Sequence, residues 1–220
     1  MLVRAPAKIN LALDILGKDA ASGYHEIQTI YQEVPHLFDE LEITPTDDGI
    51  ISVECNDLRV PLGEENTAHG AARLLQRRFG AGKGAHIVIR KKIPIGGGLG
   101  GGSSNAAATL HALNELWEVH ASPQILEELA REISMDCAFF LHGGTALGTH
   151  FGEVVTPLLP LPPEIKLEII ETGVLVSSRE AYQWIDLHRC AAQKNKTEKL
   201  LDAIKSGDAQ GIMENIHNDF

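Results

Sequence analysis

Hydrophobic and polar residues alternate along several stretches of the chain, and such alternation predicts β-strands. The clearest alternating stretch is AKINLALDIL, close to the first residue. A second stretch, DELEITPTDDGIISVEC, predicts two strands, because Asp47, Asp48 and Gly49 form a turn signal in its middle. Three further segments predict a strand ended by Pro94, a hairpin or loop between strands, and a later strand: residues 85–94, 143–155 and 166–171.

Other segments have the spacing of amphipathic helices. Residues 65–80 predict a helix that Gly80 closes, and Ser122 with Pro123 supplies an N-cap and a first-turn proline for another helix. Helices are also expected around residues 180–188 and 196–206. The strongest helical stripe follows the glycines of the central region, with apolar residues at intervals of three and four: Ala106, Leu110, Leu113 and Trp117.

The order of these elements predicts an α+β fold, because strands and helices are mixed without strict alternation. The chain has 220 residues, which allows one large domain or two small ones. Prolines cluster at Pro160, Pro162 and Pro163, where a domain boundary is plausible. The sequence therefore predicts a first domain over residues 1–157 and a second over residues 158–220.

One stretch, PIGGGLGGGSSNAA, concentrates glycine between a predicted strand and a predicted helix. A helix start presents unpaired backbone N–H groups and the positive end of the helix dipole, and glycines let a bulky anion approach them closely. The pattern predicts a cradle for a di- or triphosphate. The stretch consists of Pro94, Ile95, Gly96, Gly97, Gly98, Leu99, Gly100, Gly101, Gly102, Ser103, Ser104, Asn105, Ala106 and Ala107.

Common glycine-rich motifs fit this stretch less well. No lysine follows the glycines, as a Walker A loop requires, and no G-x-S-x-G elbow of a serine hydrolase is present in the stretch. A G-x-G-x-x-G match exists, but so many glycines satisfy almost any such pattern. A Rossmann loop should also have an acidic residue at a strand end some 20 positions later, and here that region is still helix or the turn at Ala121. A flexible linker rarely leads into a strongly striped helix.

The charge and cysteine content narrow the class of protein further. The formal net charge is −11, which argues against a general nucleic-acid surface, so local cations such as Lys91 must help to hold an anion. Three widely spaced cysteines fit neither a disulfide framework nor a zinc site, which favours a reducing, cytoplasmic setting. The N-terminus lacks the pattern of a signal peptide, and no apolar run approaches the ~20 residues of a membrane span.

Four motifs, in order, resemble the GHMP kinases, a superfamily that includes galactokinase, homoserine kinase, mevalonate kinase and phosphomevalonate kinase. They are APAKINLALDILGK, GYHEIQTIYQ, PIGGGLGGGSSNAAA and MDCAFFLHGGTALGTHFGE. The resemblance implies a two-domain fold, with an N-terminal mixed sheet and helices like those of ribosomal protein S5. The implied C-terminal domain is ferredoxin-like and incomplete here, because the family continues beyond Phe220 with a helix and a glycine-rich motif.

The doubled serine followed by Asn105 is similar to one branch of this family. Its members use ATP to phosphorylate the 2-hydroxyl of 4-diphosphocytidyl-2-C-methyl-D-erythritol in the non-mevalonate route to isoprenoid precursors. The resemblance implies that Asp136 takes the hydroxyl proton and that Lys8 lies beside it. It also implies contacts of Asn66 and Lys91 with the nucleotide, in addition to the glycine-rich stretch. Mg²⁺ is expected with ATP, and Ser104 is its nearest candidate ligand.

The same resemblance implies a pocket for a cytidine diphosphate sugar-alcohol. Tyr24 would stack on the cytosine ring, His25 would hydrogen-bond its edge, and Tyr182 would form the opposite wall. Ser178 is expected to add a hydroxyl contact, and Asn10 to touch the diol or a phosphate. Further expectations are no nucleic-acid or membrane partner, and a monomer or homodimer.

Departures from the family pattern leave two alternatives open. Cys137–Ala138 and His150–Phe151 replace the usual Val-Pro and Gly-Arg. One alternative is a GHMP kinase acting on another small alcohol, which would have no pyrimidine for Tyr24 to stack upon. The other, if the chain is naturally this short, is a non-catalytic nucleotide-binding protein. The missing C-terminal glycine-rich motif supports it, and the retention of both Lys8 and Asp136 disfavours it.

Overall fold

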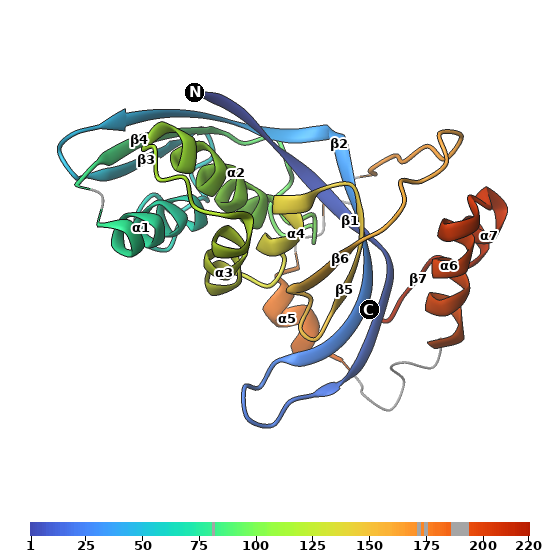
Figure 1. Cartoon of the computed structure of the whole chain (residues 1–220). Coiled ribbons are helices and arrows are strands. Elements are labelled where there is room, and N and C mark those ends of the chain that lie inside the picture. The colour runs from blue at the N-terminus through green and yellow to red at the C-terminus, as the bar shows by residue number, and fades with distance from the viewer. Residues whose placement is uncertain (81, 171–172, 174–175, 186–193) are drawn as a thin grey trace. The chain divides into compact units, whose positions relative to one another are not determined.

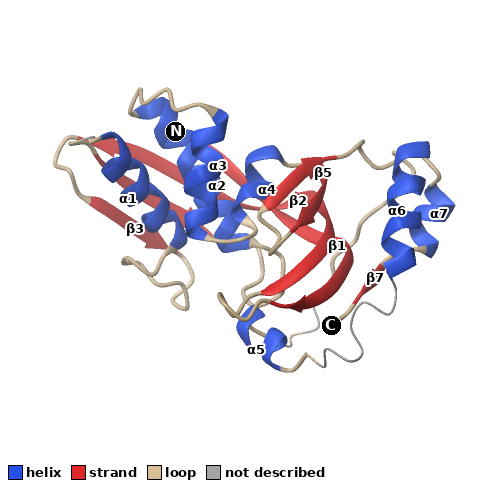
Figure 2. Ribbon diagram, turned by 60° about the horizontal axis from the view of Figure 1, so that its bottom comes forward, coloured by secondary structure: helices blue, strands red, loops and turns tan. Residues whose placement is uncertain are grey.

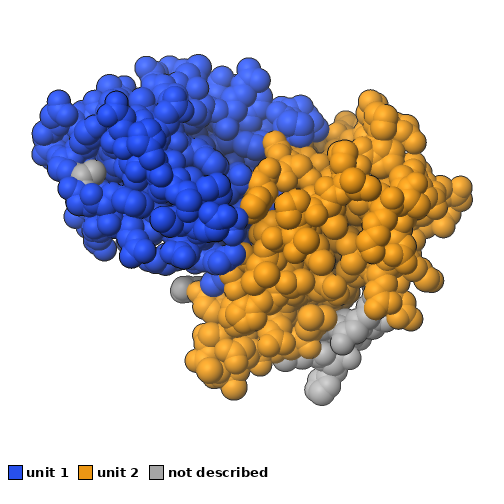
Figure 3. Space-filling view, in the orientation of Figure 1, with its two compact units in different colours: residues 1–7, 35–94, 100–141 blue, residues 8–34, 95–99, 142–220 orange. Residues whose placement is uncertain are grey.

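The computed structural model describes residues 1–80, 82–170, 173, 176–185 and 194–220. These residues form two compact units, shown in different colours in Figure 3. Unit 1 comprises residues 1–7, 35–94 and 100–141, and unit 2 comprises residues 8–34, 95–99 and 142–220. The two units do not coincide with a division at residue 157, and that domain boundary stays a prediction.

Unit 1 packs helices on one face of a sheet (Figures 1 and 2). Strand β4 lies between β3, with which it is parallel, and β2, with which it is antiparallel from Glu40↔Arg90 to Thr46↔Gly84. The apolar side chains of the sheet and of the helices form a buried core. Its elements are β3 (Ile51–Cys55), α1 (Thr67–Phe79), β4 (Gly84–Arg90), α2 (Gly101–Leu116), α3 (Pro123–Ile133), most of α4 (Cys137–His142), and parts of β1 (Leu2–Lys18) and β2 (His25–Thr46).

The helix ends in unit 1 follow local signals. Asn66 caps α1 by accepting hydrogen bonds from the N–H groups of Ala68 and His69, and Gly80 ends the helix in the left-handed conformation, with φ of 61°. Ser122 caps α3 in the same way, through the N–H of Ile125. The predicted ends at Gly80 and Ser122 are therefore confirmed, and the whole apolar stripe of α2 is buried.

Unit 2 is built on the remaining parts of β1 and β2. Strand β5 pairs antiparallel with β2 at Thr29↔Gly148 and with β6, and β7 pairs parallel with β1 at Ala12↔His217. A buried cluster that includes Leu11, Ile30 and Leu200 joins the strands to the C-terminal helices. The elements of the unit are β5 (Thr145–Thr149), β6 (Val154–Pro157), α5 (Ser178–Gln183), α6 (Lys194–Ser206), α7 (Ala209–Glu214) and β7 (His217–Asn218).

Two parts of the sequence prediction need correction. No strand is present within residues 166–170, the described part of the segment KLEIIE, although inward and outward side chains alternate there. Alternation alone does not make a strand, which also needs a hydrogen-bonded neighbour, and none pairs with these residues in the described part of the chain. The sequence analysis also missed α4, α7 and β7, which are too short to have a clear hydrophobic period.

A buried polar cluster fixes the C-terminal elements of unit 2 to β1. His217 Nε2 lies 3.0 Å from Asp14 Oδ1, and Thr197 Oγ1 donates to the other oxygen of the same carboxylate. The second ring nitrogen of His217 lies 2.9 Å from the carbonyl oxygen of Asn215. Because Asp14 is fully buried, its carboxylate depends on these partners for the hydrogen bonds that water would otherwise supply.

We expect His217→Leu to lower the free energy of unfolding by about 3 kcal/mol, because it leaves the buried Asp14 carboxylate without its ring partner. Chemical denaturation followed by circular dichroism measures the effect. His111→Leu is the matched control, since His111 is exposed on α2 and its replacement should leave the midpoint almost unchanged. Equal midpoints for the two variants would show that the cluster adds no stability.

Candidate active site

The glycine-rich stretch forms a turn that only glycine adopts easily. Gly98 has φ of 67°, and Gly100, the N-cap residue of α2, has φ of 70°. Residues other than glycine are strained at such backbone angles. The turn delivers the chain into α2, so the N–H groups of the first turn, beginning at Gly101, have no partner within the helix. This local geometry is that of an anion cradle.

Residues 95–99 of this stretch belong to unit 2 and are tied to it through the main chain. The N–H of Lys8, in β1, donates to the carbonyl oxygen of Leu99 at 3.0 Å, and the N–H of Val176 donates to that of Gly96 at 3.2 Å. Leu99 directly precedes Gly100 in the chain. The backbone of Lys8 is therefore bonded to the residue that leads into the start of α2.

Asp39 of unit 1 anchors the segment that enters the glycine-rich stretch. Its buried carboxylate accepts hydrogen bonds from the N–H groups of Lys92 and Ile93, at 2.7 and 2.8 Å. Its other oxygen accepts one from the ammonium of Lys91 at 2.5 Å. A Cβ atom on Gly101 would lie 2.6 Å from this ammonium, so Asp39 holds a cation against the first residue of α2. The sequence analysis missed Asp39, which lies more than 50 residues away and has no motif around it.

The first turn of α2 contains polar atoms with different partners. Ser103 Oγ lies 2.8 Å from Ser134 Oγ. Ser104 Oγ and Asn105 Oδ1 are buried and have no hydrogen-bond partner in the described part of the chain. A buried oxygen without a partner is costly. The Ser104 hydroxyl therefore suits a ligand that supplies the missing interaction, as a phosphate or its magnesium ion does.

Asn66 has a structural role at the start of α1. Besides capping the helix, its amide Nδ2 donates to the carbonyl oxygen of Pro61 at 2.7 Å. Next to it, Thr67 Oγ1 donates to the carbonyl oxygen of Gly102 at 2.6 Å, which connects the starts of α1 and α2.

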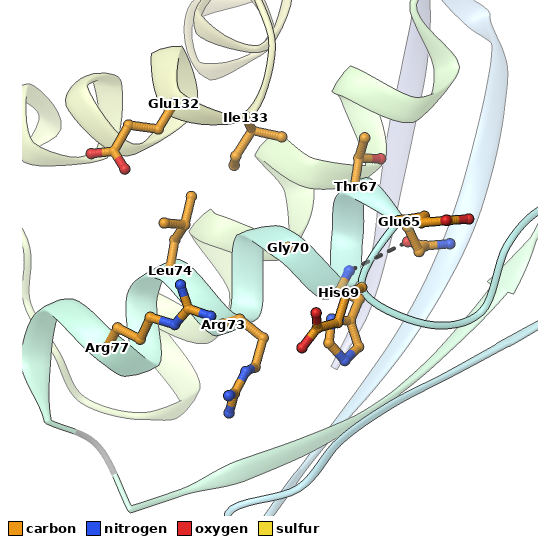
Figure 4. A pocket seen from close by; sticks show the side chains of 11 residues that line it. Glu65, Thr67, His69, Gly70, Arg73, Leu74, Arg77, Glu132 and Ile133 are labelled. Atoms are coloured by element: carbon orange, nitrogen blue, oxygen red, sulfur yellow. Dashed lines mark hydrogen bonds between the residues drawn. The ribbon is translucent and has the colours of Figure 1, made fainter.

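A cavity of about 320 Å³ lies along α1 (Figure 4). It is lined by Glu64, Glu65, Asn66, Thr67, His69, Gly70, Arg73, Leu74, Arg77, Glu132 and Ile133.

Lys8 is held by a chain of hydrogen bonds within unit 2. Its ammonium donates to Asn10 Oδ1 at 2.9 Å, and the amide of Asn10 donates to Thr29 Oγ1 at 2.7 Å. Thr29 Oγ1 in turn donates to the carbonyl oxygen of Ala12 at 2.7 Å. The ammonium also lies 5.4 Å from the centre of the Tyr31 ring. These contacts fix the position of a nearly buried cation.

Asp136 lies in unit 1, directly before α4. Its neighbour Cys137 is fully buried. Burial, together with the negative charge of Asp136, raises the pKa of the Cys137 thiol to about 12. Asp136 and Lys8 fall in different units, and each unit is described by itself, so their proximity stays a prediction.

The candidate base-binding residues lie in unit 2 among aromatic rings. His25, at the start of β2, stacks on Tyr182 with the ring centres 5.0 Å apart. Burial, with a smaller effect from the charge of Lys18, lowers the pKa of His25, so its ring is neutral at pH 7. The ring of Tyr24 instead contacts the ring of Phe151, with the ring centres 5.5 Å apart. The sequence analysis noted Phe151 as a departure but gave it no role.

Helix α5 positions Tyr182. Ser177 and Glu180 form a capping box at its start, and Tyr182 packs against a buried cluster that includes Leu13 and Ile27. The helix ends at Gln183, and its C-cap residue, Trp184, is 73% exposed. Ser178 begins the helix, but its side chain lies outside the part of the protein that the structure describes.

Metal-binding clusters and helices long enough to span a membrane are both absent from the described part of the chain. Within the described ranges, no three histidine, cysteine or acidic side chains are grouped so that they could bind a metal ion. None of the helices described has both the length and the apolar character needed to span a bilayer. Oligomeric state and cellular location stay predictions.

Comparison with known proteins defines the class of protein. Residues 66–144 match the family of GHMP kinases N terminal domain. The chain belongs to the GHMP kinases, a family of ATP-dependent small-molecule kinases. Within it, the chain is a homologue of 4-diphosphocytidyl-2-C-methyl-D-erythritol kinase. It is 39% identical over 216 residues to that enzyme from Shouchella clausii, covering 98% of this chain and 71% of the relative.

Other relatives support the same family and fold. The kinase of the same name from Caldicellulosiruptor bescii is 41% identical over 218 residues, which cover 99% of this chain and 75% of that one. A crystal structure of 4-(cytidine 5'-diphospho)-2C-methyl-D-erythritol kinase superposes with a TM-score of 0.69 at 31% identity, covering 94% of this chain and 72% of that one. Homoserine kinase from Cytophaga hutchinsonii shares the fold, with a TM-score of 0.70 at 18% identity, over 99% and 71% of the two chains. The predicted α+β fold of the GHMP kinases is confirmed.

We expect Asp39→Asn to lower the free energy of unfolding by about 3 kcal/mol, because the Lys91 ammonium loses its buried charge partner. Denaturant unfolding followed by circular dichroism measures this. Glu40→Gln is the matched control, since the adjacent pair of Glu40 and Lys92 is exposed and such pairs add little stability. If both variants unfold at the same denaturant concentration, Asp39 does not anchor the segment.

Cys137 should resist alkylation in the folded protein. Iodoacetamide reacts with thiolates, and a thiol with a pKa of about 12 stays protonated at pH 8. We expect mass spectrometry of the digested protein to find Cys55 modified and Cys137 unmodified, and both modified after unfolding, when the ordinary pKa returns. Equal labelling rates for the two cysteines in the folded protein would contradict the buried position beside Asp136.

Proposed function

We propose that the chain transfers the γ-phosphoryl group of ATP to the 2-hydroxyl of 4-diphosphocytidyl-2-C-methyl-D-erythritol. The single observation that carries this proposal is the main-chain bond from Lys8 to Leu99. It brings the backbone of the candidate cationic residue to the loop that leads into α2. The names of the homologous kinases supply the substrate.

The phosphates of ATP would lie on the main chain of residues 96–105. This assignment is supported by the left-handed turn at Gly98 and Gly100 and by the N–H groups at the start of α2. Lys91, which Asp39 holds against Gly101, presents an ammonium donor at the start of α2, with its charge balanced by the Asp39 carboxylate. Ser104 fits as a ligand of the magnesium ion that accompanies ATP, because its hydroxyl is buried without a partner among the described residues.

In the proposed reaction, the substrate oxygen attacks the γ-phosphorus as its proton passes to a carboxylate oxygen of Asp136. The bond between the γ-phosphorus and the bridging oxygen breaks, and ADP leaves. Lys8 would stabilise the negative charge on the transferred group, because Asn10 and Thr29 restrain its ammonium. Catalysis of this kind depends on positioning, which a nearly buried and hydrogen-bonded cation provides better than a mobile one.

The cytosine ring would be recognised by Tyr24, His25 and Tyr182. His25 is neutral at pH 7, so one ring nitrogen donates a hydrogen bond and the other accepts one, which suits the mixed donor and acceptor edge of cytosine. Tyr182 would move from its contact with His25 to become a wall of the base site. Asn10 and Ser178 remain proposed contacts of the substrate's polar groups.

Replacing Asp136 with Asn tests the chemistry. The amide keeps the size of the side chain but does not take the hydroxyl proton, so we expect turnover of the cytidine substrate to fall by about 100-fold or more. The Kd for ATP should stay within about twofold, because the phosphates are held by other groups. Coupled assays of ADP release and calorimetry with a non-hydrolysable ATP analogue measure the two quantities.

The control variant is Asp47→Asn, an exposed change in the turn after β2 that should alter neither quantity. Unchanged turnover in Asp136→Asn would refute the assignment of the base. Phosphorylation of homoserine or mevalonate in place of the cytidine substrate would refute the proposed specificity. Binding of both ligands without any turnover would favour a non-catalytic protein.

A further inference from the structure

Two hydrogen bonds tie the tip of the β5–β6 hairpin to β2 in unit 2. The carbonyl oxygen of His150 accepts a hydrogen bond from the N–H of Ile27 at 2.7 Å. The carbonyl oxygen of Gly152 accepts one from the Tyr31 hydroxyl at 3.4 Å. The antiparallel ladder between β2 and β5 continues from these contacts. The tip therefore lies beside the start of β2, near Tyr24 and His25.

Hydrogen bonds within the tip hold the main chain at Phe151. Its N–H donates to Glu153 Oε2 at 3.0 Å, and the other carboxylate oxygen of Glu153 is bonded to the His150 ring. His150 itself has φ of 64°, in the left-handed region that residues other than glycine adopt uncommonly. The ring of Phe151 contacts both the ring of His150, with the ring centres 3.8 Å apart, and the ring of Tyr24.

The ring of Phe151 packs against the ring of Tyr24. The two ring centres are 5.5 Å apart with an angle of 34° between the planes, within the range of favourable aromatic pairs. Tyr24 is 52% exposed, so one side of its ring is packed and much of the rest faces solvent. A half-exposed tyrosine without such a neighbour would exchange freely among its rotamers.

We propose that Phe151 is a positioning residue for the nucleobase site: it holds the Tyr24 ring in the orientation that stacks on the base. This inference rests on the proposed function. It adds that the base affinity of this chain depends on a residue outside the substrate contacts, acting through Tyr24. Pre-ordering a ring before binding saves the entropy that its ordering would cost on binding.

Phe151→Ala should raise the KM for 4-diphosphocytidyl-2-C-methyl-D-erythritol by about fivefold, the scale of one aromatic pair. The kcat and the KM for ATP should stay within about twofold, because neither depends on Tyr24. Phe151→Tyr keeps the ring and should behave like the wild type. Phe79→Ala, at the exposed end of α1 in unit 1, is the control for loss of a surface aromatic ring and should change none of the constants.

A double-mutant cycle separates positioning from direct contact. In a Tyr24→Ala background, Phe151→Ala should have no further effect on the KM, because the ring that it positions is gone. A full fivefold loss in that background would overturn the proposal, since Phe151 would then touch the base itself. An unchanged KM in the single variant, or equal losses in kcat and in the affinity for ATP, would overturn it too.

Calorimetry with cytidine diphosphate separates this inference from the proposed function. If the wild-type chain does not turn over the substrate, the reaction assignment fails. Weaker cytidine diphosphate binding by Phe151→Ala, by about fivefold, with recovery in Phe151→Tyr, would still support the role of Phe151. Equal affinities in the wild type and in Phe151→Ala would refute that role, whatever the result of the kinase assay.

Discussion

The proposed phosphate site depends on one constraint: the start of α2 must present bare main-chain N–H groups. Side chains on the loop before α2 would block those N–H groups. Residues other than glycine would also be strained at the left-handed backbone angles of Gly98 and Gly100. A backbone without side chains is also entropically expensive to order. The neighbouring contacts offset that expense, because Asp39 holds the entering segment and the bonds from Lys8 and Val176 hold the turn.

The buried polar groups fall into two kinds. Asp14, Asp39 and Asn66 all have their hydrogen bonds supplied by the chain itself. Asp14 and Asp39 connect segments that are distant in sequence, whereas Asn66 caps α1 and donates to the nearby carbonyl oxygen of Pro61. Ser104 and Asn105 are buried with oxygens that lack a partner among the described residues. Completed networks stabilise a fold, and a buried oxygen without a partner leaves a position that a ligand atom can complete. The completed network of Lys8, Asn10 and Thr29 belongs to the candidate site as well, because it orients the ammonium.

The sequence predicted best what neighbouring residues decide. The ends of α1 and α3 followed from Gly80 and Ser122, and the glycine-rich turn followed from its composition. The contact of Asp39 with Lys91 and that of Tyr24 with Phe151 could not be predicted, because they depend on strand pairing between distant segments. For the same reason the segment at 166–170, which alternates without a partner, was wrongly predicted to be a strand. The roles of Lys8 and Asp136 came from family resemblance and stay predictions.

Trp184 gives this protein a built-in optical probe. The chain has two tryptophans, and they differ strongly in environment: Trp117 is 4% exposed in unit 1, while Trp184 is 73% exposed at the end of α5. An exposed indole emits at longer wavelength than a buried one, so the red side of the emission spectrum reports mainly on Trp184. Because Trp184 directly follows α5, its emission reports on the surroundings of this short helix without an attached dye.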